Sequence, residues 1–133
     1  MRIRPPFSAL AVSVLAGTAF LAACQSSPPP RSSAGVAALP MMERVALAAN
    51  ACWFKSNDPA FKPYRLAPEL NSFSGRPRIL LVKRHSPEAR PLAVIQAEGS
   101  PARLQAFGPL FAEPIGPRMV GDIRRWSTGD KAC

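Results

Sequence analysis

The side chains best suited to catalysis in this sequence are one histidine, the serine after it and a pair of glutamates. His85 and Ser86 are adjacent, and a serine hydrolase would need such groups beside an orienting acid. Glu69 and Glu98 form the best carboxylate pair for glycoside hydrolysis, in which two carboxylates flank the sugar bond. Because His85 lies in a strongly basic run, we expect it to face solvent. No serine-hydrolase, zinc-protease, P-loop or dinucleotide-binding motif occurs, so we predict that the protein is not an enzyme.

Residue counts exclude other kinds of chemistry. A single histidine cannot build a multi-histidine metal centre, and three cysteines are too few for a four-cysteine zinc module. We therefore expect no metal site and no cofactor. The length of 133 residues provides room for one domain rather than two, which also excludes a large multilayer enzyme fold.

The first 24 residues follow the order of a secretory signal. Arg2 and Arg4 form a short positive segment, and residues 7–23 carry no charge and are mostly apolar. This uncharged run is at the lower limit of the length that can span a membrane. Small residues precede Cys24, which favours processing over a permanent membrane span.

The end of this segment, Leu21-Ala22-Ala23-Cys24, resembles the lipobox of bacterial lipoproteins. In that family the cysteine sulfur receives a diacylglycerol, a signal peptidase cuts before the cysteine, and the new amine is usually acylated. The resemblance implies that residues 1–23 are a signal peptide and that Cys24 carries palmitate-type chains. Two or three such chains would anchor a protein stably, whereas one chain binds only marginally. An ordinary signal peptide with a chance cysteine is the alternative.

The residue after the lipobox bears on location. In enteric lipoproteins an aspartate after the lipidated cysteine favours retention in the inner membrane, and this chain has Gln25 there. The resemblance therefore implies an anchor in the outer membrane of a Gram-negative envelope, with the domain facing the periplasm. Residues 24–39 are rich in Ser, Pro, Gly and Ala, which is typical of a flexible tether, and residues 40–133 hold the periodic segments of a domain.

The two other cysteines, Cys52 and Cys133, are expected to form a disulfide. A signal peptide would deliver them to an oxidising compartment, where disulfides persist. Redox-active pairs usually lie close in sequence, as in C-x-x-C, and these two are far apart. A redox pair and two free thiols are the alternatives.

Basic residues outnumber acidic ones by 17 to 8, which gives a formal charge of +9, or +7 without residues 1–23. Such an excess suits anionic surfaces. In an envelope these are lipid headgroups, lipopolysaccharide phosphates or acidic proteins, and we expect no nucleic acid partner. A solvated surface without a dedicated ligand is the alternative. The candidate residues flank the central apolar run or lie on the last predicted helix: Arg76, Arg78, Lys83, Arg84, Arg90, Arg118, Arg124 and Arg125.

Hydrophobic periodicity predicts the elements that must position these residues. Met41, Val45, Ala48 and Cys52 share one face of a helix over about 40–54. Met42, Ala49 and Trp53 widen that face. Apolar and alternating runs predict four strands, and the spacing of Met119, Ile123 and Trp126 predicts a helix from Pro117 that ends near Gly129. The four strand runs cover residues 64–71, 79–82, 92–97 and about 103–106.

Short connections between these runs favour an antiparallel meander with a helix at each end. Both helices would cover one face of the sheet, which gives an α+β fold. Within it, Trp53, Phe54 and Trp126 are expected to pack in the core. The sequence thus predicts a membrane-anchored envelope lipoprotein with a binding or scaffolding domain. A small envelope hydrolase and a periplasmic inhibitor or ligand-binding lipoprotein are the alternatives.

Overall fold

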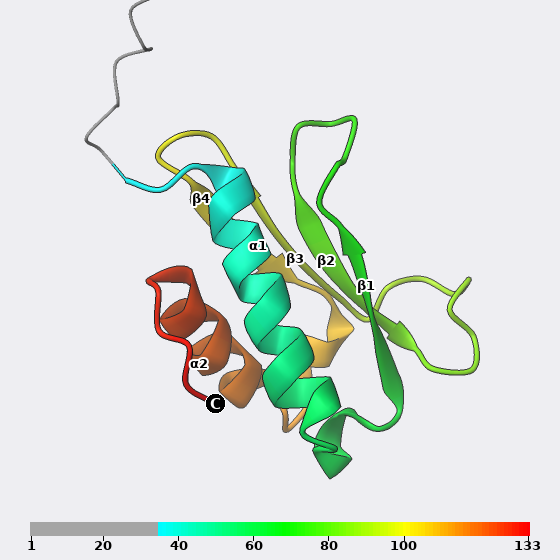
Figure 1. Ribbon diagram of the computed structural model, residues 1–133. Coiled ribbons are helices and arrows are strands. Elements are labelled where there is room, and N and C mark those ends of the chain that lie inside the picture. The colour runs from blue at the N-terminus through cyan, green and yellow to red at the C-terminus, as the bar shows by residue number, and fades with distance from the viewer. Residues whose placement is uncertain (1–34) are drawn as a thin grey trace, which may run out of the picture. The chain divides into compact units, whose positions relative to one another are not determined.

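The computed structural model describes residues 35–133, so the predicted signal peptide 1–23, Cys24 and the first part of the predicted tether lie outside the described residues. Two α-helices bracket a four-stranded sheet, and short helical turns join them (Figure 1). The predicted α+β fold and its element order are confirmed. The elements are α1 (Ala38–Ala49), η1 (Asn50–Lys55), η2 (Pro59–Phe61), β1 (Tyr64–Glu69), β2 (Arg78–Lys83), β3 (Ala93–Glu98), β4 (Arg103–Phe107), η3 (Pro109–Ala112) and α2 (Gly116–Ser127).

The sheet is an antiparallel meander in the order β1-β2-β3-β4. Helix α1 packs against β2, β3 and α2, and Leu104 of β4 lies beside Ile123 of α2. Both helices therefore cover the same face, as predicted. The central strand β2 is buried along residues 79–82, but only Ile79 and Leu81 belong to the core beneath the helices. Leu80 and Val82 lie on the opposite face of the sheet.

Strand β1 is at the edge of the sheet and contains Pro68. Pro68 is paired with Ile79, whereas the main-chain N–H of Arg84 donates to the carbonyl of Pro63 at 2.9 Å. Hydrogen-bonded and non-hydrogen-bonded pairs alternate along an antiparallel ladder. Because the pair of Pro63 and Arg84 is hydrogen-bonded, the pair of Pro68 and Ile79 is not, and the main-chain nitrogen of Pro68 points away from β2. The missing N–H therefore costs the sheet no hydrogen bond.

The first helix begins at Ala38, two residues before the predicted start and inside the predicted tether. Its most deeply buried residues are Met42, Val45 and Ala49, whereas Met41 and Ala48 are only partly buried. The predicted face included these buried residues, but its centre lies at Met42 and Ala49 and not at Met41 and Ala48. Helix α1 continues directly into the π-helix η1, and this wider turn carries Cys52 and Trp53 into the core.

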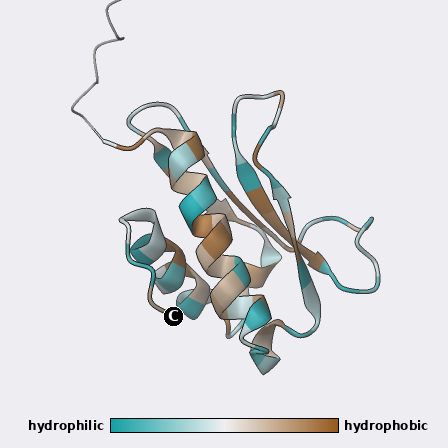
Figure 2. Ribbon diagram, viewed as in Figure 1, coloured by the Kyte–Doolittle hydropathy of each residue, from teal (hydrophilic) through white to brown (hydrophobic). Residues whose placement is uncertain are grey.

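The core is centred on aromatic side chains between the two helices and the sheet. Trp53 stacks on Phe61 with ring centroids 4.7 Å apart, and Trp126 lies against Trp53 at 5.0 Å. Figure 2 shows hydrophobic residues along the middle of α1 and on the central strands. Both tryptophans are fully buried, as predicted, while Phe54 is half-buried at the margin of the core.

Helix α2 ends where the sequence predicted. Gly129 has a φ of +108°, a conformation that favours glycine. Its N–H donates to the carbonyl of Trp126, and the N–H of Asp130 donates to that of Arg125. This pair of bonds is a Schellman motif, which satisfies carbonyl groups at the end of a helix. The chain then turns back toward η1, and Cys133 forms a disulfide with Cys52, with Cα atoms 5.2 Å apart. The predicted pairing is confirmed.

Candidate anion-binding hollow

Four of the eight basic residues predicted to meet an anionic surface form ion pairs within the domain. Two of these pairs lie on the sheet face opposite the helices, and the other two involve α2. The pairs are Arg76–Glu98 at 2.9 Å, Arg78–Glu69 at 2.6 Å, Arg118–Asp58 at 2.5 Å and Arg125–Asp122 at 2.7 Å. These guanidinium groups are already matched by carboxylates, so they are poor candidates for a separate anionic partner.

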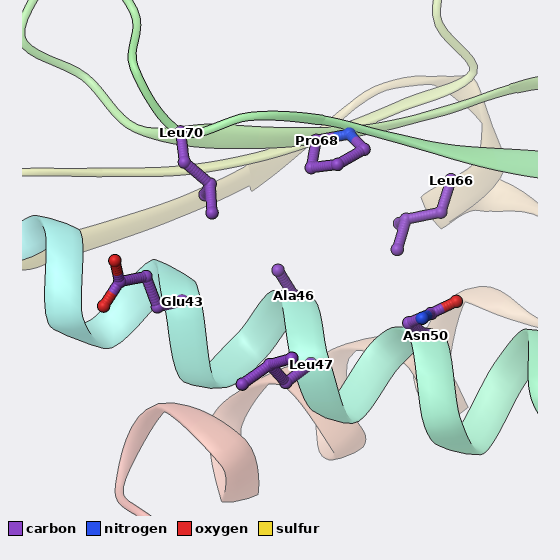
Figure 3. A pocket seen from close by; sticks show the side chains of 7 residues that line it. All are labelled: Glu43, Ala46, Leu47, Asn50, Leu66, Pro68 and Leu70. Atoms are coloured by element: carbon purple, nitrogen blue, oxygen red, sulfur yellow. The ribbon is translucent and has the colours of Figure 1, made fainter.

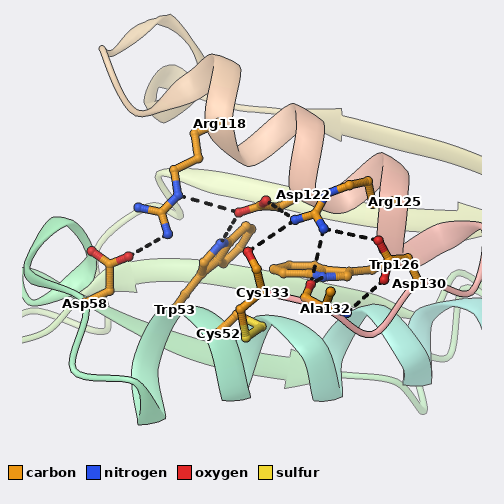
Figure 4. A network of polar contacts seen from close by, with 10 residues as sticks. All are labelled: Cys52, Trp53, Asp58, Arg118, Asp122, Arg125, Trp126, Asp130, Ala132 and Cys133. Atoms are coloured by element: carbon orange, nitrogen blue, oxygen red, sulfur yellow. Dashed lines mark hydrogen bonds and ion pairs between the residues drawn. A yellow bond between two sulfur atoms is a disulfide. The ribbon is translucent and has the colours of Figure 1, made fainter.

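The pairs on α2 are part of a polar network that stabilises the helical layer (Figure 4). Asp122 is 8% exposed and accepts the indole N–H of Trp53 at 2.9 Å and a guanidinium N–H of Arg125 at 2.7 Å. Trp126 donates its indole N–H to the carbonyl of Ala132 at 3.0 Å. The network therefore fastens the segment after α2 in place beside the disulfide. Its role is structural.

The remaining four predicted basic residues form no ion pair with any residue in the part of the chain that the structure describes. Lys83, Arg84 and Arg90 lie at the end of β2 or in the connection to β3, and Arg124 lies apart from them on α2. All four are exposed. Lys83 and Arg84 line one concave surface together, whereas Arg124 lines a separate hollow of about 180 Å³ with no second basic residue in its wall.

This hollow has a volume of about 380 Å³ and lies where β1 begins and β2 ends. Its wall includes Tyr64, Lys83, Arg84, His85 and Ser86. The register of the sheet creates it, because Tyr64 is paired with Lys83 across the two strands. Residues about 20 positions apart in the sequence thus meet at one end of the sheet.

Arg84 is held at the hollow by two hydrogen bonds to the chain before β1. Its main-chain N–H donates to the carbonyl of Pro63 at 2.9 Å, and its Nε donates to that of Lys62 at 2.6 Å. The two terminal amino groups of its guanidinium make no hydrogen bond within residues 35–133. An oriented guanidinium with free terminal donors is well suited to a carboxylate or a phosphate.

The charge around the hollow is predominantly positive. No carboxylate lines it, and Lys62 and Arg65 are exposed nearby at the start of β1. Glu88 is an exposed acidic residue in the connection between β2 and β3. The sequence analysis did not include Lys62 or Arg65 among the candidates. Their proximity to Lys83 and Arg84 follows from strand register, which a single sequence does not specify.

The residues considered for hydrolysis do not form a catalytic arrangement within residues 35–133. His85 and Ser86 line the same hollow, but no hydrogen bond joins their side chains and no carboxylate is there to orient the imidazole. Glu69 pairs with Arg78. Glu98 lies between two arginines, and its pKa is lowered chiefly by the hydrogen bond from Arg103 and then by the charge of Arg76.

No three side chains of His, Cys, Asp or Glu gather closely enough within residues 35–133 to hold a metal ion. None of the helices in this span has both the length and the apolar character that crossing a membrane requires.

A second concave surface lies between α1 and the edge strand β1 (Figure 3). This groove of about 580 Å³ is mainly apolar: Leu66, Pro68 and Leu70 project toward Ala46 of α1. Its one charged lining residue is Glu43. The sequence analysis did not predict this groove. The sequence feature that indicates the groove is that every second residue of this strand, Leu66, Pro68 and Leu70, is apolar and therefore lies on one face.

No protein-family model, curated protein or solved structure matches this chain.

Proposed function

We propose that the protein is a lipid-anchored component of the bacterial envelope whose small domain binds an acidic partner without catalysing a reaction. Cys24 is the anchor, in the outer membrane and facing the periplasm. The lipobox-like sequence Leu21-Ala22-Ala23-Cys24 supports the anchor, because the positive segment, apolar segment and small residues precede the cysteine in the expected order. Two or more acyl chains give durable membrane binding.

One observation carries the binding role: Lys83 and Arg84 share a hollow that has no carboxylate in its wall. Arg76, Arg78, Arg118 and Arg125 are matched by acids at 2.5–2.9 Å. Arg90 and Arg124 also form no ion pair within residues 35–133, and what distinguishes Lys83 and Arg84 is that they share one hollow without a carboxylate. A ligand carboxylate or phosphate there would gain charge-assisted hydrogen bonds from donors that now face solvent.

The position of the hollow favours an acidic protein over lipid of the anchoring membrane. The first described residues are fixed at the β3–β4 turn, because the N–H of Ala102 donates to the carbonyl of Val36 at 2.9 Å. The hollow is at the opposite end of β2, about 17 Å away along a six-residue strand. A basic hollow remote from the tether is better placed to meet a partner in the periplasm.

Site-specific photocrosslinking in native membranes tests this role. A photoreactive residue replaces Ser86 in the full chain, and the adduct is compared in three backgrounds: unchanged, Lys83→Glu and Arg124→Glu. Arg124 is a matched control, because it is also exposed and without an ion pair within residues 35–133. We expect one protein adduct that Lys83→Glu abolishes and Arg124→Glu preserves.

The adducts themselves decide between the partner classes. A crosslinked protein with an acidic surface, lost at high salt, is the expected result. If only lipid adducts form, the proposal of a protein partner is wrong and the hollow binds a membrane surface. An adduct of equal yield in all three backgrounds would contradict the role of the hollow.

A further inference from the structure

Apolar side chains gather at the end of the domain where the tether joins it. Six large apolar side chains are exposed among residues 35–133, and three of them, Val36, Leu39 and Phe73, lie at this end. Phe73 is the most exposed of the six, at 112% of the reference value. Single exposed apolar residues are ordinary in proteins. Three at the end that carries the tether are positioned to meet the same surface.

Phe73 is presented by an ordered turn in the β1–β2 loop. The N–H of Gly75 donates to the carbonyl of Ser72 at 3.0 Å, and the hydroxyl groups of Ser72 and Ser74 are 2.7 Å apart. The φ of Gly75 is +68°, which completes the turn without strain. The base of the loop is joined to the sheet, because the N–H of Ala97 donates to the carbonyl of Pro77 at 3.2 Å.

The same end of the sheet holds the start of the described chain. The N–H of Ala38 donates to the carbonyl of Gly99 at 3.0 Å, which fixes the beginning of α1 at the β3–β4 turn. Figure 1 shows this turn, the first turn of α1 and the loop 70–77 together at one end of the domain. Ten residues separate Cys24 from Gly35, and they reach at most ~40 Å even when fully extended.

The charged residues at this end also suit a membrane surface. Three arginines, Arg76, Arg78 and Arg103, surround two glutamates, Glu69 and Glu98, so the group keeps one excess positive charge. The Arg76 and Arg103 side chains are 53% and 78% exposed. Because carboxylates already match these guanidinium groups, their contribution is a small net positive charge that does not oppose approach to an anionic membrane. Phenylalanine is among the side chains that surface-bound segments bury at the boundary between headgroups and acyl chains.

We propose that the loop 70–77 inserts Phe73 into the interfacial region of the membrane that holds Cys24, with Val36 and Leu39 beside it. This inference depends on the proposed anchor at Cys24. The contact would orient the domain so that its tether end faces the lipid and the hollow at Lys83 and Arg84 faces away from it.

Fluorescence quenching by brominated lipids tests the contact. The mature lipidated protein is reconstituted into vesicles of phosphatidylethanolamine and phosphatidylglycerol with brominated acyl chains. Phe73→Trp is compared with Phe107→Trp, because Phe107 is also exposed but lies at the opposite end of β4. The native Trp53 and Trp126 are fully buried and provide a constant background. We expect Phe73→Trp to lose most of its added emission and Phe107→Trp to keep it.

Vesicle flotation of the same samples separates this inference from the anchor. If the protein floats and Phe73→Trp is strongly quenched while Phe107→Trp is not, the result supports both the anchor and the membrane contact. Flotation with equal quenching, or none, in the two variants would overturn the membrane contact and leave the anchor intact. Failure of the wild-type protein to float would overturn both claims. A chain without residues 1–24, which has neither the lipid nor the apolar signal segment, should neither float nor be quenched.

Discussion

Asp122 is a nearly buried carboxylate whose two oxygens have different partners. One oxygen accepts the indole N–H of Trp53 at 2.9 Å, and the other accepts a guanidinium N–H of Arg125 at 2.7 Å. Removing the carboxylate would leave a buried N–H group without an acceptor, which costs more than a hydrogen bond normally contributes. This residue therefore links η1, which carries Trp53, to α2.

We predict that Asp122→Ala lowers the free energy of unfolding by about 2–3 kcal/mol. Asp122→Asn should cost less, because the amide oxygen can still accept the hydrogen bond from Trp53. Urea unfolding followed by tryptophan fluorescence measures both changes. Equal stability of the wild type and Asp122→Ala would show that the network contributes nothing.

Three carboxyl groups with lowered pKa values, two of them half-buried and one exposed, should make the free energy of unfolding depend on pH in the acidic range. The pKa of Asp58 is lowered chiefly by its hydrogen bond from Arg118, that of Glu98 by Arg103, and that of Asp130 by the N–H of Ala132. A lowered pKa in the folded state means that the stabilisation is present above the unfolded value, about 4, and is lost as pH falls through the folded value.

Urea unfolding between pH 7 and pH 2 checks this dependence. We expect nearly constant stability down to about pH 5 and a decline below about pH 4. In Asp58→Asn the charge is absent, so stability should be lower at neutral pH and the acid decline shallower. A variant curve parallel to that of the wild type would contradict the role of the Asp58–Arg118 pair.

At the scale of single residues, the sequence was sufficient to predict exposure where the neighbouring residues in the chain determine it. A histidine in a strongly basic run is exposed, and His85 is exposed in the structure. The sequence did not reveal that Arg118 and Arg125 are occupied by Asp58 and Asp122. The pair Arg118–Asp58 joins residues 60 positions apart, so it depends on tertiary structure.

Among the elements, the strands could be predicted closely and the first helix less so. Strands have a side-chain period of two, and turn residues bound the apolar runs, so β2 and β3 lie within about a residue of their predicted positions. Helix α1 departs from the prediction because η1 is a π-helix, with a wider turn than an α-helix. Extending an α-helical period through Cys52 centred the predicted face on Met41 and Ala48, with the more deeply buried Met42 and Ala49 at its margin.

The disulfide joins η1 to the segment after α2, with a sequence separation of 81 residues. Closing a loop of this length lowers the entropy of the unfolded chain. We predict that Cys133→Ser lowers the free energy of unfolding by about 4–5 kcal/mol on the chain-entropy model. Cys52→Ser should cost at least as much, because Cys52 is 5% exposed and its substitution also places a hydroxyl in the core.

Reduction provides the control for this prediction. Adding dithiothreitol to the wild type should reproduce the loss seen in Cys133→Ser, and it should leave the stability of Cys133→Ser unchanged. Mass spectrometry without reduction should find the peptide pair that contains Cys52 and Cys133. Free thiols at both positions in the mature protein would contradict the pairing.

At the scale of the whole molecule, the two ends of the sheet have different chemistry. The end where the tether joins presents Phe73 and neighbouring apolar residues, and the other presents Lys83 and Arg84 without carboxylate partners in their hollow. The sequence identified Lys83 and Arg84 as basic candidates, but it could not locate the hollow. The hollow requires the pairing of Tyr64 with Lys83, a register that the sequence leaves undetermined.

Lipid attachment at Cys24 is the claim on which the orientation of the domain depends. Metabolic labelling with palmitate tests it directly, using the wild type, Cys24→Ala and Cys133→Ser as a cysteine control. We predict that label enters the wild type and Cys133→Ser but not Cys24→Ala, and that the labelled chain begins at Cys24. Equal labelling of Cys24→Ala and the wild type, or no labelling of either, would contradict the anchor.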